Sequence, residues 1–264
     1  MNFDGKVVLI TGGSSGIGAA CVKEFAARKA AVAIIDRQPL AEGSLGRGNR
    51  AEYFRADVSR ATEVQQVIRA IVSCFGGIDV VVNNAGIQRY GSVTTISEEE
   101  WDEVLNVNLK SAFLVSKYAI PEMLKRGGGA IVMTGSVQSV TAVRNSAHYV
   151  TSKHALLGLT RSIALDYGKQ NIRANCVLPG AIDTPMLRWS ASLDTDSARV
   201  LAACDRLHIR GTMGRAEEVA RVIAFLASDL ASFMTGAAIP VEGGMLVPAG
   251  GLTFQETGTG AVKA

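Results

Sequence analysis

The chain has 264 residues, of which 48% are hydrophobic and 19% are charged, and its formal net charge is +3. This composition is typical of globular proteins with a substantial core and excludes an intrinsically disordered chain. The basic residues form no run of the kind that binds nucleic acid, and no apolar stretch reaches the roughly 18 residues of a membrane-spanning helix, so neither partner is predicted.

The N-terminus has no signal-peptide pattern, because the chain runs from Lys6 directly into an apolar strand. The four cysteines stand far apart, without a CxxC or Cys/His spacing. The sequence therefore predicts neither a zinc site nor a disulfide framework, and the expected compartment is the cytoplasm.

Apolar runs alternate along the chain with amphipathic segments. The apolar runs predict strands at 6–11, 31–36, 52–56, 78–82, 130–134, 172–178 and 237–241. The amphipathic segments predict helices at 16–29, 64–75, 109–125, 149–167 and 217–228. Ser97 and Glu100 form a capping-box pattern that opens one more helix.

Strands that alternate with helices at this spacing predict parallel βαβ units in a doubly wound α/β sheet, with the ligand at the carboxyl ends of the strands. Residues 37–50 are rich in Gly, Ser and Pro and predict a loop. Residues 185–212 show no clean period and predict one or two mobile helices that cover the substrate as a lid. Residues 246–264 predict a loose tail.

A glycine cluster separates the first predicted strand from the first predicted helix. Glycines at this junction permit a tight turn and let the backbone approach a pyrophosphate, while the helix N-terminus supplies N–H donors. The sequence therefore predicts a dinucleotide site at Gly12, Ser14, Ser15, Gly16, Ile17 and Gly18.

Asp36 stands 20 residues after Gly16, at the end of the second predicted strand. A carboxylate there accepts hydrogen bonds from the ribose hydroxyls of NAD and repels the 2′-phosphate of NADP. Arg37 follows directly and is able to pair with a 2′-phosphate instead. The pattern favours NAD, and NADP stays open as the alternative.

Tyr149 and Lys153 are four residues apart in a segment with helical periodicity, so their side chains are expected on one helix face. An ammonium beside a phenol favours the phenolate and lowers the pKa of the phenol, as a general acid/base near neutral pH requires. For an isolated pair, the alternative is a packing tyrosine beside a solvated lysine.

Four motifs decide between these interpretations: Thr11-Gly12-x-x-x-Gly16-Ile17-Gly18, Asn83-Asn84-Ala85-Gly86, Tyr149-x-x-x-Lys153 and Pro179-Gly180. In kind and order they resemble the motifs of the short-chain dehydrogenase/reductase family. The resemblance implies a seven-stranded Rossmann sheet in a single catalytic domain over residues 1–264. It also implies hydride transfer with NAD or NADP, and a homodimer or homotetramer formed through helices around 109–126 and 149–168.

The same resemblance implies residue roles. Tyr149 would be the general acid/base, and Lys153 would lower its pKa and hold the nicotinamide ribose. Ser136 would hydrogen-bond the substrate oxygen, and Asn108 would position a water in a proton relay. Further cofactor contacts are implied for Asp57, Val58, Asn84, Ala85, Gly86, Pro179, Gly180, Ile182 and Thr184. The one departure is the short segment after Asp36, which leaves little room for the family's usual helix.

A small-molecule substrate is expected to contact hydrogen-bonding residues on the loops, a set that suits a polyol: Gln88, Gln138, Arg144, Asn145 and His148. Residues 136–138, 144–155 and 183–186 resemble the aldohexose dehydrogenases of the family, which implies oxidation of a cyclic aldose at its anomeric hydroxyl to a lactone. Two alternatives are an NADPH-dependent ketoreductase of a small keto or acyl substrate and a non-catalytic NAD-binding sensor. The sensor would predict a broken Ser-Tyr-Lys-Asn set, and the set is intact.

Overall fold

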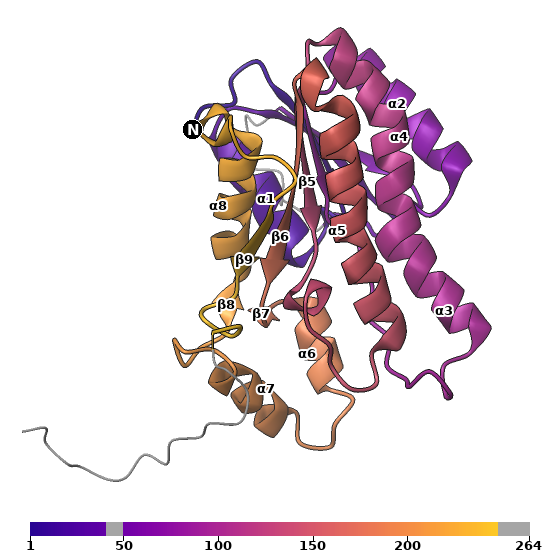
Figure 1. Cartoon of the computed structure of the whole chain (residues 1–264). Helices are drawn as coiled ribbons and strands as arrows, with labels where there is room; N and C mark the ends of the chain where they lie inside the picture. The colour runs from indigo at the N-terminus through magenta and orange to yellow at the C-terminus, as the bar shows by residue number, and fades with distance from the viewer. Residues whose placement is uncertain (41–49, 248–264) are drawn as a thin grey trace, which may run out of the picture.

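The structure is a computed structural model that describes residues 1–40 and 50–247 (Figure 1). A parallel sheet forms its centre, with the strand order β3-β2-β1-β4-β5-β6-β9. The strands are β1 (Val7–Thr11), β2 (Ala31–Asp36), β3 (Ala51–Arg55), β4 (Val80–Asn83), β5 (Gly129–Thr134), β6 (Ile172–Pro179) and β9 (Ala238–Val241). Strands β1 and β4 are buried at every position, as expected for a sheet covered on both faces. The predicted seven-stranded doubly wound fold is confirmed.

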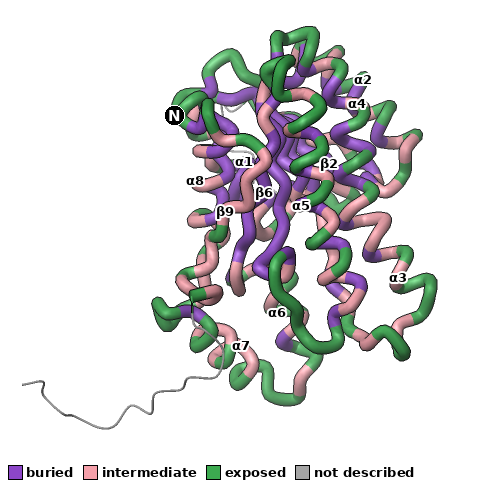
Figure 2. Tube along the Cα trace, in the orientation of Figure 1, coloured by how far each residue is buried: buried purple, intermediate pink, exposed green. Residues whose placement is uncertain are grey.

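Helices cover both faces of the sheet, which leaves the strands in the purple interior of Figure 2. One layer holds α1 (Gly16–Ala27) and α8 (Ala216–Ala227), and the other holds α2 (Ala61–Phe75), α4 (Ser111–Lys125) and α5 (Ala147–Tyr167). The predicted apolar stripes explain this arrangement. In α2, for example, Val64, Ile68 and Ile71 are buried against the sheet while the polar face stays outside.

Helix α3 (Glu98–Leu105) begins at the predicted capping box, where Glu100 N donates to Ser97 Oγ at 3.1 Å and Ser97 N donates to Glu100 Oε2 at 3.3 Å. A π-helical turn, η1 (Asn106–Lys110), then joins α3 to α4. The predicted helix at 109–125 is confirmed as α4, and η1 joins it to α3 without a break in the helical path. A π-turn adds a residue to the helical turn and rotates the next turns of the helix, and such turns are frequent at functional sites.

Beyond the carboxyl ends of the strands lie α6 (Pro185–Ala191) and α7 (Ser197–Arg206), which confirm the predicted helices of residues 185–212. We call this segment the lid, and its mobility and its role in covering a substrate stay predictions. A two-stranded parallel sheet, β7 (Ile182–Asp183) with β8 (Gly214–Arg215), flanks these helices and was not predicted. Within residues 1–40 and 50–247 there are also three short 3-10 helices: η2 (Val137–Ser139), η3 (Gly168–Gln170) and η4 (Asp229–Ala231).

Two predicted segments fall mostly beyond the part of the chain that the structure describes. Residues 37–40 form no helix, and the rest of the predicted loop, 41–49, lies outside the described residues, as does 248–264 of the predicted tail. Within 1–40 and 50–247, no helix combines the length and apolar character needed to cross a bilayer. The same ranges contain no group of three or more His, Cys, Asp or Glu side chains placed to hold a metal ion.

Candidate active site

The turn from β1 into α1 is shaped by glycines that leave room beside the backbone. Gly12 and Gly16 have φ of 67° and 52°, a region that side chains disfavour. A Cβ at Gly12 would lie 2.9 Å from Ala85 Cα, and a Cβ at Gly18 would lie 1.9 Å from the Gly12 carbonyl oxygen. Asn84 Nδ2 holds the turn by donating to that carbonyl at 3.2 Å. The space that these glycines leave beside the turn fits the pyrophosphate of a dinucleotide.

Asp36 ends β2 beside this turn. Its Oδ2 accepts hydrogen bonds from Ser14 N at 3.0 Å and Ser14 Oγ at 2.6 Å, and its Oδ1 accepts from Gln38 N at 3.0 Å. Arg37 is exposed next to it. Each carboxylate oxygen has more than one acceptor site, so the side chain is oriented by the protein and still able to accept from a ribose.

Two cavities run along the carboxyl ends of the strands and share Ser15 and Asn84. The cavity beside Asp36 has a volume of about 240 Å³, and the cavity beneath the lid about 310 Å³. Together they span the point between β1 and β4 where the strand order reverses, which is where doubly wound folds bind ligands.

The residues predicted to hold the cofactor divide between these cavities. The cavity beside Asp36 is lined by Gly12, Ser14, Ser15, Asp36, Arg37, Asp57, Val58, Asn84, Ala85 and Gly86. The cavity beneath the lid is lined by Ser15, Gly16, Ile17, Asn84, Tyr149, Lys153, Pro179, Gly180, Ile182 and Thr184. Gly18 lines neither, because it lies behind the turn and permits its close packing.

Helix α5 carries Tyr149 and Lys153 on one face, as predicted. Lys153 Nζ lies 5.4 Å from the centroid of the Tyr149 ring, and it donates to the Thr134 carbonyl oxygen at 2.8 Å. Lys153 is only 4% exposed, and its burial lowers the pKa of the ammonium to about 8. The lysine is therefore charged at neutral pH but close to losing its proton.

The pKa of the Tyr149 phenol is raised in the protein chain, although Lys153 was expected to lower it. Burial raises the pKa of Tyr149 to about 12, the neighbouring Ser136 hydroxyl opposes this increase, and Tyr90 adds to it. Desolvation of the phenolate is the largest of these effects on the pKa of Tyr149. The prediction of a lowered phenol pKa was wrong for the chain alone, which keeps Tyr149 protonated at neutral pH.

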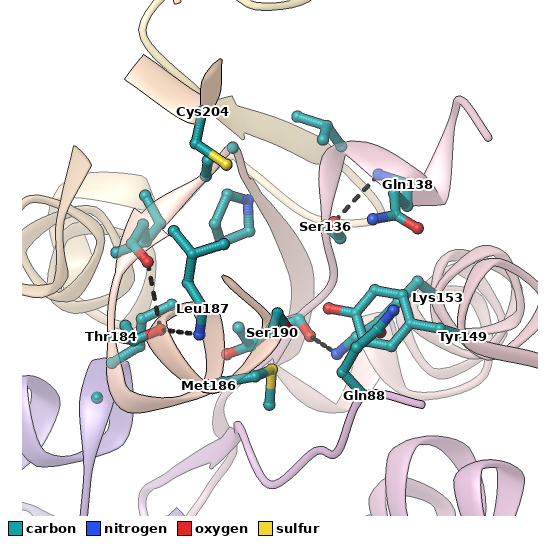
Figure 3. Close-up of a pocket in the computed structure, with 18 of the residues that line it drawn as sticks. Gln88, Ser136, Gln138, Tyr149, Lys153, Thr184, Met186, Leu187, Ser190 and Cys204 are labelled. Atoms are coloured by element: carbon teal, nitrogen blue, oxygen red, sulfur yellow. Dashed lines mark hydrogen bonds between the residues drawn. The ribbon is translucent and has the colours of Figure 1, made fainter. Parts of the chain in front are cut away.

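Ser136 follows β5 and caps η2, where its Oγ accepts from Gln138 N at 3.1 Å. Figure 3 shows Gln88, Ser136, Gln138 and Tyr149 on one side of the cavity, with Thr184, Leu187 and Cys204 opposite. The hydroxyl of Ser136 thus lies on the same wall as the phenol, within the cavity in which a substrate would bind.

Asn108 lies behind this wall and is not among the residues that line the cavity beneath the lid. Its Oδ1 accepts from Ile87 N at 2.7 Å, and its Nδ2 donates to Ile87 O at 3.0 Å and Ser152 Oγ at 3.1 Å. Asn108 therefore ties the loop after β4 to the helix that carries Tyr149. The π-turn η1 is the element that places it.

Of the five predicted substrate residues, Gln88 and Gln138 line the cavity. Gln88 is 6% exposed, and its Nε2 donates to Ser146 Oγ at 2.9 Å. The Oε1 atoms of Gln88 and Gln138 are buried and have no hydrogen-bond partner within the described residues. A buried acceptor without a partner is costly, so these two oxygens are suited to a ligand that donates.

The other three predicted substrate residues do not line this cavity. The prediction was wrong for His148, whose side chain is fully buried, whereas substrate contact stays a prediction for Arg144 and Asn145. Arg144 and Asn145 are exposed, and Asn145 has a φ of 54° in the turn before α5. His148 is fully buried on another face of α5, where its Nδ1 accepts from Tyr149 N at 3.0 Å. Burial lowers the pKa of His148, with smaller and opposing effects from Glu100 and Arg89.

The sequence interpretation did not foresee the apolar wall of the cavity, formed by Val137, Val143, Met186, Leu187, Leu207 and Met245. Nor did it foresee the stacking of Tyr90 on Trp189 of α6, with ring centroids 6.5 Å apart, which brings the loop after β4 against the lid. The spacing of Met186, Leu187 and Ser190 on a short helix is the sequence pattern that could have predicted an apolar wall on this side of the cavity.

A Rossmann sheet, two adjoining cavities at the carboxyl ends of its strands, and a half-buried tyrosine beside a buried lysine and a serine define a nicotinamide-dependent oxidoreductase. The family model described as enoyl-(acyl carrier protein) reductase matches residues 12–246. An oxidoreductase of Thermotoga maritima, itself described as uncharacterized, is 40% identical over 92% of this chain and 98% of its own. A 3-oxoacyl-(acyl-carrier-protein) reductase of the same organism is 36% identical over 94% of this chain and 100% of its own.

Among solved structures, the ligand-free aldohexose dehydrogenase of Thermoplasma acidophilum matches with a TM-score of 0.89 and 37% identity, over 96% of this chain and 98% of that one. The chain belongs to the short-chain dehydrogenase/reductase family. It is an oxidoreductase that acts on CH–OH groups of small molecules with NAD or NADP as the acceptor.

Proposed function

We propose that this enzyme oxidises a cyclic aldose at its anomeric hydroxyl to the lactone, with NAD as the acceptor. The observation that carries the proposal is the pair of buried, unpartnered amide oxygens of Gln88 and Gln138, within the described residues, on the wall that also holds Ser136 and Tyr149. Two fixed acceptors suit a substrate with several hydroxyl donors. The similarity to a structure named as an aldohexose dehydrogenase supports the same substrate class.

In this proposal the chain supplies proton transfer and orientation. When bound, the nicotinamide cofactor would supply the acceptor for the hydride of the carbinol carbon. Tyr149 takes the proton of the reacting hydroxyl, and Ser136 donates to the oxygen as it becomes a carbonyl. Lys153 supplies positive charge beside the phenolate and holds the nicotinamide ribose. Asn108 keeps Ile87 and Ser152 in place through its hydrogen bonds. In this proposal it also positions a water in the proton relay.

We propose NAD rather than NADP because Asp36 is held by Ser14 at the end of β2, facing the cavity that would receive the adenosine. A carboxylate at this position accepts from the vicinal ribose hydroxyls and repels a 2′-phosphate. The remaining contacts follow the lining of the two cavities, with the residues from Gly12 to Gly18 at the pyrophosphate and Ile182 and Thr184 at the nicotinamide.

One alternative has an observation in its favour. The lid side of the cavity is apolar at Met186, Leu187 and Leu207, and a relative named as a 3-oxoacyl-(acyl-carrier-protein) reductase is 36% identical. An NADPH-dependent ketoreductase of a small keto or acyl substrate would use that wall for an apolar chain, with Arg37 at the 2′-phosphate.

A substrate panel separates the two. Purified enzyme with NAD or NADP is mixed with aldoses, simple cyclic alcohols and hydroxysteroids, and with ketones in the reverse direction, while the absorbance of the reduced nicotinamide is followed. We expect NAD reduction with one or a few aldoses. If no aldose led to NAD reduction and a ketone was reduced with NADPH, the ketoreductase would replace the sugar dehydrogenase as the proposed function.

The variant Gln138→Met sharpens this test, because the Gln138 amide oxygen has no partner within the described residues whereas the Gln88 amide also supports Ser146. Loss of one neutral hydrogen bond to a substrate hydroxyl should lower kcat/KM for the aldose by about tenfold. The value for a simple cyclic alcohol, which lacks the second hydroxyl, should stay unchanged. Equal losses on both substrates would argue against Gln138 as a contact for sugar hydroxyls.

The pKa of Tyr149 predicts the pH dependence. Oxidation requires the phenolate, and burial raises the pKa of Tyr149 to about 12, so the reactive fraction is small at neutral pH and grows as the pH rises. We expect kcat/KM for oxidation to climb by up to about tenfold per pH unit between about pH 6 and about pH 8. At higher pH the slope should decrease, because burial lowers the pKa of Lys153 to about 8 and its charge is lost there. A plateau already at neutral pH would contradict this ionisation scheme.

We also propose that the enzyme is a homodimer or homotetramer that pairs the surfaces of α4 and α5. Phe113 and Leu165 support this, because they expose large apolar side chains on these two helices. The mass in solution, measured by light scattering, tests the proposal.

A further inference from the structure

A buried histidine outside the Tyr149 cluster connects the lid to the cavity wall. His208 lies just after α7, in the segment that leads to β8, and is 3% exposed. We infer that His208 is a positioning residue that holds the backbone of residues 179–184 in the shape that receives the nicotinamide. This inference rests on the cofactor role proposed for that segment.

Both ring nitrogens of His208 have backbone partners. Ala181 N donates to Nε2 at 3.2 Å, so Nε2 carries no proton. The ring proton is therefore on Nδ1, which lies 2.9 Å from the Cys204 carbonyl oxygen and donates to it. The neutral ring thus bridges the last turn of α7 and the residue that follows Pro179-Gly180.

The His208 ring packs closely against two glycines, Gly180 and Gly243. A Cβ at Gly180 would lie 2.9 Å from His208 Nε2, and a Cβ at Gly243 would lie 3.3 Å from the ring. Gly214 N donates to Ala181 O at 3.0 Å, so the segment after α7 holds both backbone groups of Ala181. Pro179, Gly180, Ala181, Ile182 and Thr184 all line the cavity beneath the lid. Movement of Ala181 would therefore move this wall of the cavity.

Two substitutions test separately the hydrogen bond of His208 with Ala181 and its hydrogen bond with Cys204. In His208→Gln, the amide oxygen reaches the position of Nε2 and still accepts from Ala181. In His208→Asn, the shorter amide reaches only toward Cys204, and the Ala181 N–H is left without its partner. The same change at an exposed histidine of α5, His154→Asn, serves as the matched control.

The readouts are the dissociation constant of NADH, from its fluorescence without any substrate, and hydrogen exchange of the peptide that contains Ala181. We expect His208→Asn to weaken NADH binding by about tenfold and to speed exchange at Ala181, and His208→Gln and His154→Asn to stay within about threefold of the wild type. Unchanged NADH binding in His208→Asn, or equal losses in the Gln and Asn variants, would overturn the inference. If the wild type bound neither NADH nor NADPH, both the proposed function and this inference would be overturned. If the wild type binds NADH and His208→Asn binds it equally well, only the inference about His208 is overturned.

Discussion

Replacing Tyr149 with phenylalanine is expected to lower turnover by about 10²- to 10⁴-fold, the usual contribution of a positioned general acid or base. The change removes only the hydroxyl. The ring that lies 5.4 Å from Lys153 Nζ remains, so the cavity and the packing of α5 should survive. Turnover in both directions should collapse because neither the proton acceptor nor the proton donor is left at the reacting oxygen.

The measurement compares kcat with NADH affinity in the same preparation. NADH binding within about threefold of wild type, alongside the loss of kcat, would assign the defect to proton transfer rather than to binding. Tyr167→Phe, at the other end of α5, is the matched control because Tyr167 packs at the edge of the core far from the cavity. A Tyr149→Phe enzyme that kept turnover within about tenfold of the wild type would refute the assigned role.

Much of the fold was predictable because its signals are local. The strands β1, β2 and β4 are short apolar runs that end at Thr11, Asp36 and Asn83, and burial on both faces leaves such runs without alternation. The lid was harder to predict. Ala191 is the one buried residue of α6 and every residue of α7 is at least partly exposed, so neither helix packs an apolar face into the core.

The π-turn at 106–110 depends on tertiary packing. Nothing in the composition of Asn106-Val107-Asn108-Leu109-Lys110 distinguishes a π-turn from an α-turn. The hydrogen bonds of Asn108 to Ile87 and Ser152 exist only once the sheet and α5 are in place. An asparagine whose partners are 21 and 44 residues away cannot be assigned from periodicity.

The error at His148 has a simple geometric cause. Neighbouring residues of a helix point about 100° apart, so His148 cannot share the face on which Tyr149 meets the cavity. Position along the chain suggested a substrate contact, whereas the helix directs the ring into the protein, against Tyr149 N. Arg144 and Asn145 form the exposed turn before α5, so their contact with a substrate stays a prediction.

The spacing of Tyr149 and Lys153 in the sequence does not predict how far burial shifts their pKa values. The spacing places the two groups correctly, but the sign of a pKa shift depends on desolvation as well as on charge. Here burial raises the pKa of Tyr149 and lowers that of Lys153, so the chain alone stabilises the neutral form of both groups.

Replacing Asp36 with asparagine is expected to shift the ratio of kcat/KM for NAD over NADP by about 10²-fold toward NADP, since the like-charge repulsion of a 2′-phosphate is worth a few kcal/mol. The asparagine amide keeps one oxygen to accept from Ser14, which donates twice to Asp36 Oδ2 at 3.0 and 2.6 Å. The turn of the glycine motif should therefore stay in place while the charge is lost. Use of NAD should decrease as well, because an amide accepts from ribose hydroxyls less strongly than a carboxylate does.

The second substitution, Arg37→Ala in the Asp36→Asn background, identifies what receives the 2′-phosphate. Arg37 is exposed at the rim of the same cavity, and its guanidinium is the nearest cation in the sequence to the position of the removed charge. If Arg37 pairs with the phosphate, the double variant should lose the gained NADP activity and keep its NAD activity. Dissociation constants of NADH and NADPH, which need no substrate, provide the same comparison. A wild type that already favours NADP, or an Asp36→Asn variant with an unchanged ratio, would show that another residue selects the cofactor.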